Sequence, residues 1–511
     1  MAVNIRVIGA SQRPKQAAGT LVIGTKRRLL EDDVRALLPA GVAGVWEAMV
    51  GRVVPGDNGA GTCTWVEGKT AHQVSVGALP SACSRHNCTA RPHAVSNVVR
   101  GHAPRKGVLE IIAAMERPED ALATACAVAR AYPEFSLKSA KAGAKKPKAR
   151  QVRLLLVGPD GAVAKPAQRK RAQLALDGVR FASALVDAPT SEVDTDALLA
   201  AAREVAEETG AEIHVVRGAN LHKKGFGGLW GVGKAAVAPP ALVTLSLGGK
   251  PLPRDRKLSG SGAKKGAASK LGEAVVWVGK GIVYDTGGLS LKTKSGMPGM
   301  KGDMAGAAAV LGAFRAAARG GWDSKKRGPL HAVLCLAENA VGPTSFRPDD
   351  VIKLYSGKTV EVNNTDAEGR LVLGDGVAWA VRRLDPKVVV DLATLTGAQL
   401  TATGRRHAAI VCNDAGLEAR ALAAGRLSGD LAHPLPYCPE FFRKEFKSKV
   451  ADMKNSVADR ANAQSSCAAQ FVANHMTPWT GPWLHVDIAG PATTHERATG
   501  YGVALLLALF S

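Results

Sequence analysis

Residues 363–371 read NNTDAEGRL, and this run is the most informative stretch of the 511-residue chain for both fold and function. Asp366, Glu368 and Arg370 occupy alternate positions in it. If the backbone is extended there, alternate side chains point to the same side, so all three would share one face. Two carboxylates on one face repel each other unless a cation lies between them. The run therefore predicts a metal site and leaves Arg370 available to hold a further anion.

A second run, rich in Lys, Asp and Gly, lies upstream at residues 278–306 and reads VGKGIVYDTGGLSLKTKSGMPGMKGDMAG. It follows an apolar stretch at 274–278 that we expect to be a strand, and α/β proteins place their sites at the ends of strands. Its glycines allow the backbone to bend tightly around a ligand. The side chains that stand out in this run are Lys280, Asp285, Lys292 and Asp303.

The two runs together supply four carboxylates. Hard oxygen ligands in this number suit two divalent cations, such as Zn²⁺, Mn²⁺ or Mg²⁺. A lysine can ligate a metal only when it is neutral, so a ligating lysine needs a strongly lowered pKa. A second, charged lysine could polarise a substrate carbonyl. The alternative is that each Asp or Lys caps a helix or faces solvent, as single residues of these types more commonly do.

Around these runs, strand-like and helix-like segments alternate. This pattern indicates an α/β protein, with a smaller N-terminal α/β domain and a larger C-terminal catalytic α/β domain whose central mixed, largely parallel sheet is flanked by helices. We expect strands at 151–157, 241–247, 274–278, 331–338 and 387–392. Helices are expected at 109–131 (broken near Pro118), 169–186, 194–209 (capped by Asp194), 304–319 (capped by Asp303) and 371–384.

Two basic tracts mark the domain organisation. We expect an N-terminal domain at 1–135, a basic linker at 136–150, and a catalytic domain at 151–511 that carries a basic surface insertion at 250–270. The tracts account for much of the formal net charge of +23. They could form an arm that binds nucleic acid or another polyanion. Because neither tract contains aromatic residues on which bases could stack, we favour the alternative that they are a solvated linker and a surface insertion.

Several other classes of protein are disfavoured. The sequence contains no run of 18 apolar residues, which is about the length that a membrane-spanning helix needs. The eight cysteines are scattered, which indicates reduced thiols and a cytoplasmic location. Cys83 and Cys88 with two nearby histidines could suggest a zinc knuckle, but we expect free thiols because no second cysteine pair follows. The SGKT at 356–359 lacks the first glycine of a phosphate-binding loop, and we expect it to be a turn between strands.

The motifs resemble those of the leucyl aminopeptidase (cytosol aminopeptidase) family over roughly residues 175–511. The resemblance rests on NTDAEGRL together with GKGIVYDTGGLSLK, MKGDMAGAA, ATLTGA (393–398) and WLHVDIAGPA (483–492), which follow in the family's order. The stretches GFGGLWGVGKAAVAPPAL and CSRHNC resemble the branch called probable aminopeptidase-like 1.

The resemblance implies a role for each residue of the site. One metal would be held by Lys280, Asp285, Asp303 and Glu368, and the other by Asp285, Asp366 and Glu368. Lys292 would polarise the scissile carbonyl, and Arg370 would hold a bicarbonate ion as general base for a metal-bridged hydroxide. The substrate site would be lined by Met300, Thr394, Leu395 and Gly397.

The resemblance also implies two Zn²⁺ or Mn²⁺ ions, short peptides with a free N-terminus as substrates, and a homohexamer of two trimers. Residues 460–471 depart from the family pattern near the side-chain pocket, which leaves the preferred N-terminal residue open. Two other functions remain alternatives at this stage. One is a nucleic-acid-binding protein that uses the basic tracts, and the other is a metallohydrolase of a different amide.

Overall fold

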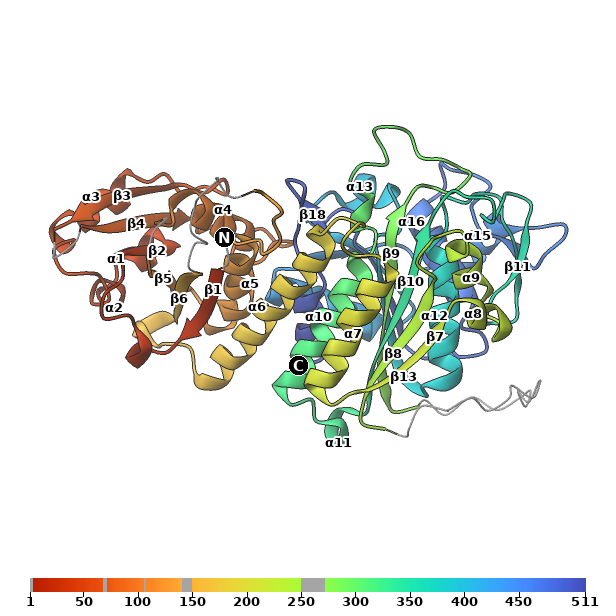
Figure 1. The fold of residues 1–511 in the computed structure, drawn as a ribbon. Coiled ribbons are helices and arrows are strands. Elements are labelled where there is room, and N and C mark those ends of the chain that lie inside the picture. Colours follow the sequence, from red (N-terminus) through yellow and green to blue (C-terminus); the bar gives the residue numbers. More distant parts are fainter. Residues whose placement is uncertain (1–2, 68–70, 105–106, 140–148, 250–271) are drawn as a thin grey trace. The chain divides into compact units, whose positions relative to one another are not determined.

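The structure, a computed structural model, describes residues 3–67, 71–104, 107–139, 149–249 and 272–511. The chain divides into two compact units (Figure 1). Unit 1 comprises Met1–Ala184, Leu422–Leu431 and Val503–Ser511, and unit 2 comprises Leu185–Ala421 and Ala432–Gly502. Each unit has its own β-sheet and helices, so the predicted α/β class with two sheet domains is confirmed.

Unit 1 contains a six-stranded sheet in the order β1-β6-β5-β2-β4-β3. All neighbours are parallel except β3 and β4. The strands are β1 (Val3–Ile8), β2 (Gly19–Thr25), β3 (Gly61–Val66), β4 (His72–Leu79), β5 (Leu109–Ala114) and β6 (Arg150–Val157). The helices packed with this sheet include α1 (Lys26–Leu30), α3 (Ala43–Arg52) and α4 (Pro92–His102), and α5 (Ala121–Arg130) packs against α4.

Two expectations about unit 1 were wrong. Residues 109–131 are not one helix, because the first six form the buried strand β5, a 3-10 turn follows at Pro118–Asp120, and only then does α5 begin. A strand buried on both faces is a continuous apolar run, which periodicity does not distinguish from a buried helix. The division at residue 151 also differs from the structure, because β6 pairs with β1 and β5 of the first sheet.

Unit 2 is built on an eight-stranded mixed sheet in the order β15-β14-β17-β13-β9-β10-β8-β7. The centre is parallel, with β17, β13, β9 and β10 running in one direction. Strands β7, β8 and β14 pair antiparallel to their inner neighbours. The bounds are β7 (Glu212–Arg217), β8 (Ala241–Leu247), β9 (Ala274–Asp285), β10 (Leu330–Asn339), β13 (Pro386–Ala393), β14 (Ala408–Cys412), β15 (Ala432–Pro434) and β17 (Trp483–Asp487).

Helices cover both faces of this sheet. Figure 1 shows α7 (Thr195–Thr209) and α10 (Ala305–Gly320) on one side of the central strands and α12 (Gly369–Arg383) on the other. Helix α12 also packs against α9 (Gly227–Gly233) and α16 (Gln464–Asn474). The predicted cap of α7 is confirmed, because Ala197 N donates to Asp194 Oδ1 at 2.9 Å.

A small third sheet, β11-β12-β16, lies in the same unit. Its strands are β11 (Val351–Lys353), β12 (Thr359–Glu361) and β16 (Met453–Lys454). Residues 356–358 of the SGKT run lie in the turn between β11 and β12, as predicted, and Thr359 begins β12. Residues 140–148 of the expected linker and the whole expected insertion at 250–270 lie outside the described residues. Among the helices that the structure describes, none is long and apolar enough to cross a bilayer.

Candidate metal centre

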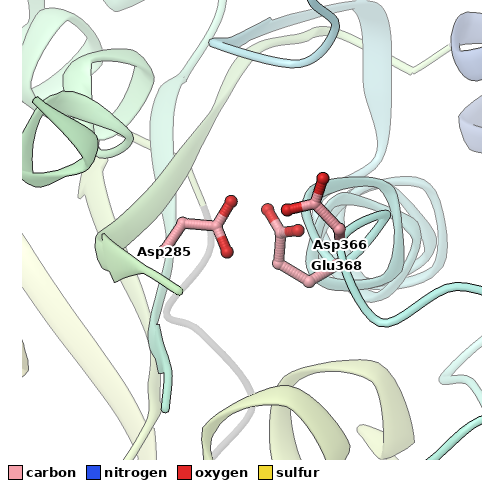
Figure 2. Close-up of side chains that lie close together, drawn as sticks. All are labelled: Asp285, Asp366 and Glu368. Atoms are coloured by element: carbon pink, nitrogen blue, oxygen red, sulfur yellow. The ribbon is translucent and has the colours of Figure 1, made fainter. Parts of the chain in front are cut away.

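Three carboxylates converge at the carboxyl end of β9. Asp285 is the last residue of that strand, and Asp366 and Glu368 precede the first turn of α12. Figure 2 shows the three side chains pointing toward one another. Each contributes one oxygen to a set whose members all lie within 4.8 Å of one another. The structure therefore joins the two sequence runs in one acidic cluster.

The local backbone of residues 363–371 differs from the extended form that we expected. Residues 365 and 366 form a turn, Glu368 is the N-cap of α12 with φ −72° and ψ −36°, and Arg370 already lies in the helix. The alternate side chains therefore do not share one face of a strand. Arg370 is buried and donates from Nη1 to the carbonyl of Asn455 at 3.0 Å. Burial lowers the pKa of Arg370 to about 10.

Lys280 lies beside the acids on the same strand as Asp285. Its Nζ is 2.8 Å from Asp303 Oδ1 and 3.0 Å from Glu368 Oε1, and it donates to the carbonyl of Thr394 at 2.8 Å. Burial would lower the pKa of Lys280, but the facing carboxylates raise it above its ordinary value. This direction is opposite to the one expected for a ligating lysine. Cations bound to the same carboxylates would offset their negative charge and so remove the cause of the raised pKa of Lys280.

Lys292 approaches the cluster from the loop after β9. Its Nζ lies 2.8 Å from Asp285 Oδ2 and 2.5 Å from Asp366 Oδ1. Burial opposes the charged form, yet the carboxylate of Asp285 and the hydrogen bond to Asp366 raise the pKa of Lys292. Lys292 is therefore an ammonium ion at neutral pH, at the edge of the acidic cluster.

The carboxylates are short of partners. Burial raises the pKa of Asp303 to about 6 and that of Glu368 to about 8, although both face Lys280. Asp303 Oδ2 and Glu368 Oε2 are buried and have no hydrogen-bond partner. Asp303 also does not cap a helix as predicted, since α10 begins at Ala305 with Met304 as its N-cap. A cation would satisfy these oxygens, so the residues present fit a metal centre.

Glycines give the cluster the space that it needs. A Cβ on Gly369, the first residue of α12, would lie 2.6 Å from Lys280 Nζ. A Cβ on Gly287 would lie 3.0 Å from Asp366 Oδ1, and its φ of 84° favours glycine in any case. Larger residues at these two positions would displace the lysine or the carboxylate.

The predicted substrate-site residues lie in two segments beside the cluster. Thr394 Oγ1 donates to Asp303 Oδ1 at 2.7 Å, and its carbonyl accepts from Lys280, so this residue adjoins the acids directly. Leu395 follows it, and Gly397 is the N-cap of α13 (Ala398–Thr403), where nothing lies within 4 Å of an added Cβ. Met300 lies in the turn that leads to Asp303. The N–H of Asp303 donates to the carbonyl of Met300.

Sequence reasoning missed polar residues that hold the cluster in place. Asn339 is fully buried at the end of β10, and its Nδ2 donates to Asp285 Oδ1 at 2.8 Å and to the Thr365 carbonyl at 3.1 Å. Asp487, at the end of β17, accepts from the N–H of Leu395 at 3.0 Å. A search for polar residues that directly end the parallel strands could have found both.

Two family models match this chain. The catalytic domain of the cytosol aminopeptidase family matches residues 180–507, and the M17 aminopeptidase N-terminal domain 2 matches residues 20–141. The catalytic match contains every residue of the acidic cluster.

Individual relatives agree with the family models. Human "Probable aminopeptidase NPEPL1" is 50% identical over 437 residues, covering 85% of this chain and 79% of the relative. Leucine aminopeptidase 1 of Caenorhabditis elegans is 40% identical over 445 residues, covering 86% of this chain and 83% of the relative. The structure of leucyl aminopeptidase from Trypanosoma brucei in complex with bestatin has a TM-score of 0.84 and 37% identity, covering 100% of this chain and 96% of that one. On the fold, the acidic cluster and these matches, the chain belongs to the cytosol (leucyl) aminopeptidase family.

Proposed function

We propose that the protein is a two-metal aminopeptidase that hydrolyses the N-terminal peptide bond of short peptides. The observation that carries this proposal is the convergence of two lysines and four acids from separate parts of the chain. They are Lys280, Asp285, Lys292, Asp303, Asp366 and Glu368. A group of this composition, with orphaned buried carboxylate oxygens, is typical of a centre for divalent cations and not of a structural ion-pair network.

The proposed ligands divide into two overlapping sets. Lys280, Asp285, Asp303 and Glu368 would hold one cation, and Asp285, Asp366 and Glu368 would hold the other. When bound, two such cations lower the pKa of a water molecule and neutralise charge that develops on the peptide oxygen. Zn²⁺ and Mn²⁺ both suit carboxylates combined with one amine, so either can be the resident ion.

The two remaining charged residues would act on the substrate and on the base. Lys292 would donate a hydrogen bond to the carbonyl oxygen of the scissile bond, where negative charge grows in the transition state. Its Nζ already lies among the acids of the centre, 2.8 Å from Asp285 Oδ2. Arg370 would hold bicarbonate, which would accept the proton of the attacking water. The guanidinium is buried and its Nε has no hydrogen-bond partner, which leaves a donor for an anion.

The substrate would lie against the segments that carry Met300, Thr394, Leu395 and Gly397. A site rich in carboxylates also attracts the positive α-amine of a peptide, which favours substrates with a free N-terminus. Assembly into a homohexamer and a cytoplasmic location complete the proposal. Both rest on the family resemblance.

The test is an assay of purified protein on leucyl-amide substrates, with and without added Mn²⁺ or Zn²⁺. We expect metal-dependent release of the amino acid and no release from the same substrate with an acetylated amine. Glu368→Ala removes a ligand common to both sets, so it should lower kcat/KM by at least about a hundredfold, or roughly 3 kcal/mol. Glu440→Ala, which removes an exposed acid of the same unit, should leave turnover unchanged.

Wild-type protein that is folded and loaded with metal, yet releases no amino acid from any leucyl substrate, would overturn the proposed function. If the Glu368→Ala variant turned over substrate as fast as wild type, the proposed activity would stand but the proposed ligand sets would be wrong.

A further inference from the structure

Asn455 is a buried asparagine whose side chain is fully used by the turn that carries the acids. Its Oδ1 accepts from the N–H of Asn363 at 2.9 Å and of Asn364 at 3.3 Å. Its Nδ2 donates to the carbonyls of Asn364 at 2.6 Å and Ala367 at 3.2 Å. Asn455 has no exposed surface. One amide group therefore joins both ends of the segment that contains Asp366.

The backbone of Asn455 adds two more bonds to the same region. Its N–H donates to the carbonyl of Glu361 at 3.1 Å, and its carbonyl accepts from Arg370 Nη1 at 3.0 Å. The next residue continues the pattern, because Ser456 N donates to Asn363 Oδ1 at 2.9 Å. Asn455 thus contacts the chain before, within and after the acidic turn.

The small third sheet explains how Asn455 reaches this place. Strand β16 runs parallel to β12, with Val360 opposite Met453 and Glu361 opposite Lys454. Both strands end at the second of these pairs. The two chain segments that follow the strands stay side by side and are joined by hydrogen bonds of asparagine side chains. The sheet has three short strands and is too small to be a core by itself. Its effect is to bring Asn455 against the acidic turn.

Other bonds also hold this turn, since Thr365 N donates to Ser290 Oγ at 3.1 Å and Asn339 Nδ2 donates to the Thr365 carbonyl at 3.1 Å. Those bonds fix Thr365, whereas Asn455 bonds to residues on both sides of Asp366. Residues 363–368 contain no helix or strand, and their buried N–H and C=O groups need partners. An asparagine offers two donors and an acceptor with two lone pairs in one rigid plane, so it can serve four backbone groups at once. Removal of that amide would deprive the N–H groups of Asn363 and Asn364 and the carbonyl of Ala367 of this partner, whereas the Asn364 carbonyl would keep its bond from the N–H of Ala367 at 3.2 Å. Buried groups without partners favour a different turn conformation.

We propose that Asn455 is a positioning residue, which holds the 363–368 turn in the conformation that presents Asp366 and Glu368 to divalent cations. This inference rests on the proposed function, because it takes the acidic cluster as the cation site. Asn455 itself is not a ligand in this scheme, and it acts through the backbone of the residues that are. Its loss should lower cation affinity in molecules that remain folded, by roughly 10- to 100-fold as for other groups that support metal ligands.

The experiment compares Asn455→Ala and Asn455→Asp with wild type in the full chain. The Asp variant keeps the shape of the side chain but places an oxygen against the carbonyls of Asn364 and Ala367, so it loses the donors without creating a cavity. Asn413→Ala is the matched control, because the Asn413 side chain also bonds backbone groups of a distant segment of unit 2, the Gly481 carbonyl and the Trp483 N–H, and not the acidic turn. Mn²⁺ affinity is measured by calorimetry, and amide hydrogen exchange is measured for peptides that cover residues 361–371.

We expect both Asn455 variants to bind Mn²⁺ at least tenfold more weakly than wild type, and their 361–371 peptides to exchange faster. The control should match wild type in both readouts. Wild-type Mn²⁺ affinity in the folded Asn455 variants would overturn the inference, and so would unchanged exchange in that peptide. The proposed function is judged separately, because it fails only if wild type itself binds no cation or releases no amino acid.

Discussion

At the residue scale, unit 2 contains a buried carboxylate that is not part of the candidate metal centre. Asp375 lies in α12 with no exposed surface, and it accepts the N–H of Leu229 at 2.8 Å and of Tyr355 at 2.7 Å. It therefore joins three segments of the core. Burial outweighs these hydrogen bonds and raises the pKa of Asp375 to about 7.

This raised pKa predicts a pH-dependent stability. Folded Asp375 keeps its proton up to about pH 7, whereas the unfolded chain releases it near the ordinary value of 3.8. The folded state therefore binds more protons between these values, and stability falls as pH rises through them. Relative to Asp375→Asn, the free energy of unfolding of wild type should fall by roughly 3 kcal/mol from pH 5 to pH 8. Denaturant titrations at both values measure this difference, and a constant difference would contradict the prediction.

At the element scale, the position of α10 against the sheet depends on two glycines. A Cβ on Gly306 would lie 2.2 Å from the Leu392 carbonyl of β13 and 3.1 Å from the backbone nitrogen of Lys280. A Cβ on Gly279 of β9 would lie 2.6 Å from Cα of Ala307. The helix and the two strands therefore meet backbone to backbone. This close approach sets the distance between Lys280 on β9 and Asp303, which lies two residues before α10.

Gly306→Ala should therefore destabilise unit 2 although alanine favours helix. Overpacking of this kind costs about 1–3 kcal/mol, and more where backbone atoms block the added methyl group. Displacement of α10 should also weaken Mn²⁺ binding. Gly101→Ala in α4 is the control, because nothing lies within 4 Å of a Cβ there. It should be neutral or stabilising by up to about 1 kcal/mol. Equal effects of the two substitutions in denaturant unfolding would refute the close-packing explanation.

At the scale of the whole molecule, every candidate ligand belongs to unit 2. The six charged residues of the metal centre all lie within Leu185–Ala421, and none lies in unit 1. Cation binding to the folded state should therefore stabilise one unit and leave the other unaffected.

We expect two thermal transitions, of which one shifts with Mn²⁺ and one does not. At a concentration of one hundred times Kd, each bound cation contributes about 2.7 kcal/mol to the folded state. That amount should raise the midpoint of unit 2 by several degrees in calorimetry, and a chelator should reverse the shift. Asp285→Asn should abolish it. A shift of both transitions together, or of neither, would contradict the assignment of the cation site to unit 2.

Much of the fold and of the candidate site could be predicted from local patterns. Alternating strand and helix signals indicated the α/β class, and the cap at Asp194 was placed correctly because capping depends on neighbouring residues. The upstream run was singled out because it follows an expected strand, and Asp285 does end β9. Asp366 and Glu368 were singled out by their alternate spacing, although the extended backbone assumed for them was wrong. The individual roles proposed for these residues remain predictions.

The tertiary structure alone decided three other matters. Strand β5 was mistaken for a helix, because burial on both faces removes the periodicity that separates the two. The 363–371 run is a turn and a helix start and not a strand, because partners elsewhere in the chain bind its backbone groups. Asn339 and Asn455 hold the acids over separations of 54 and about 90 residues, and such hydrogen bonds leave no periodic pattern in sequence. The sequence by itself thus determined which acids and lysines to expect in the candidate site, and the folded chain determined how they are held.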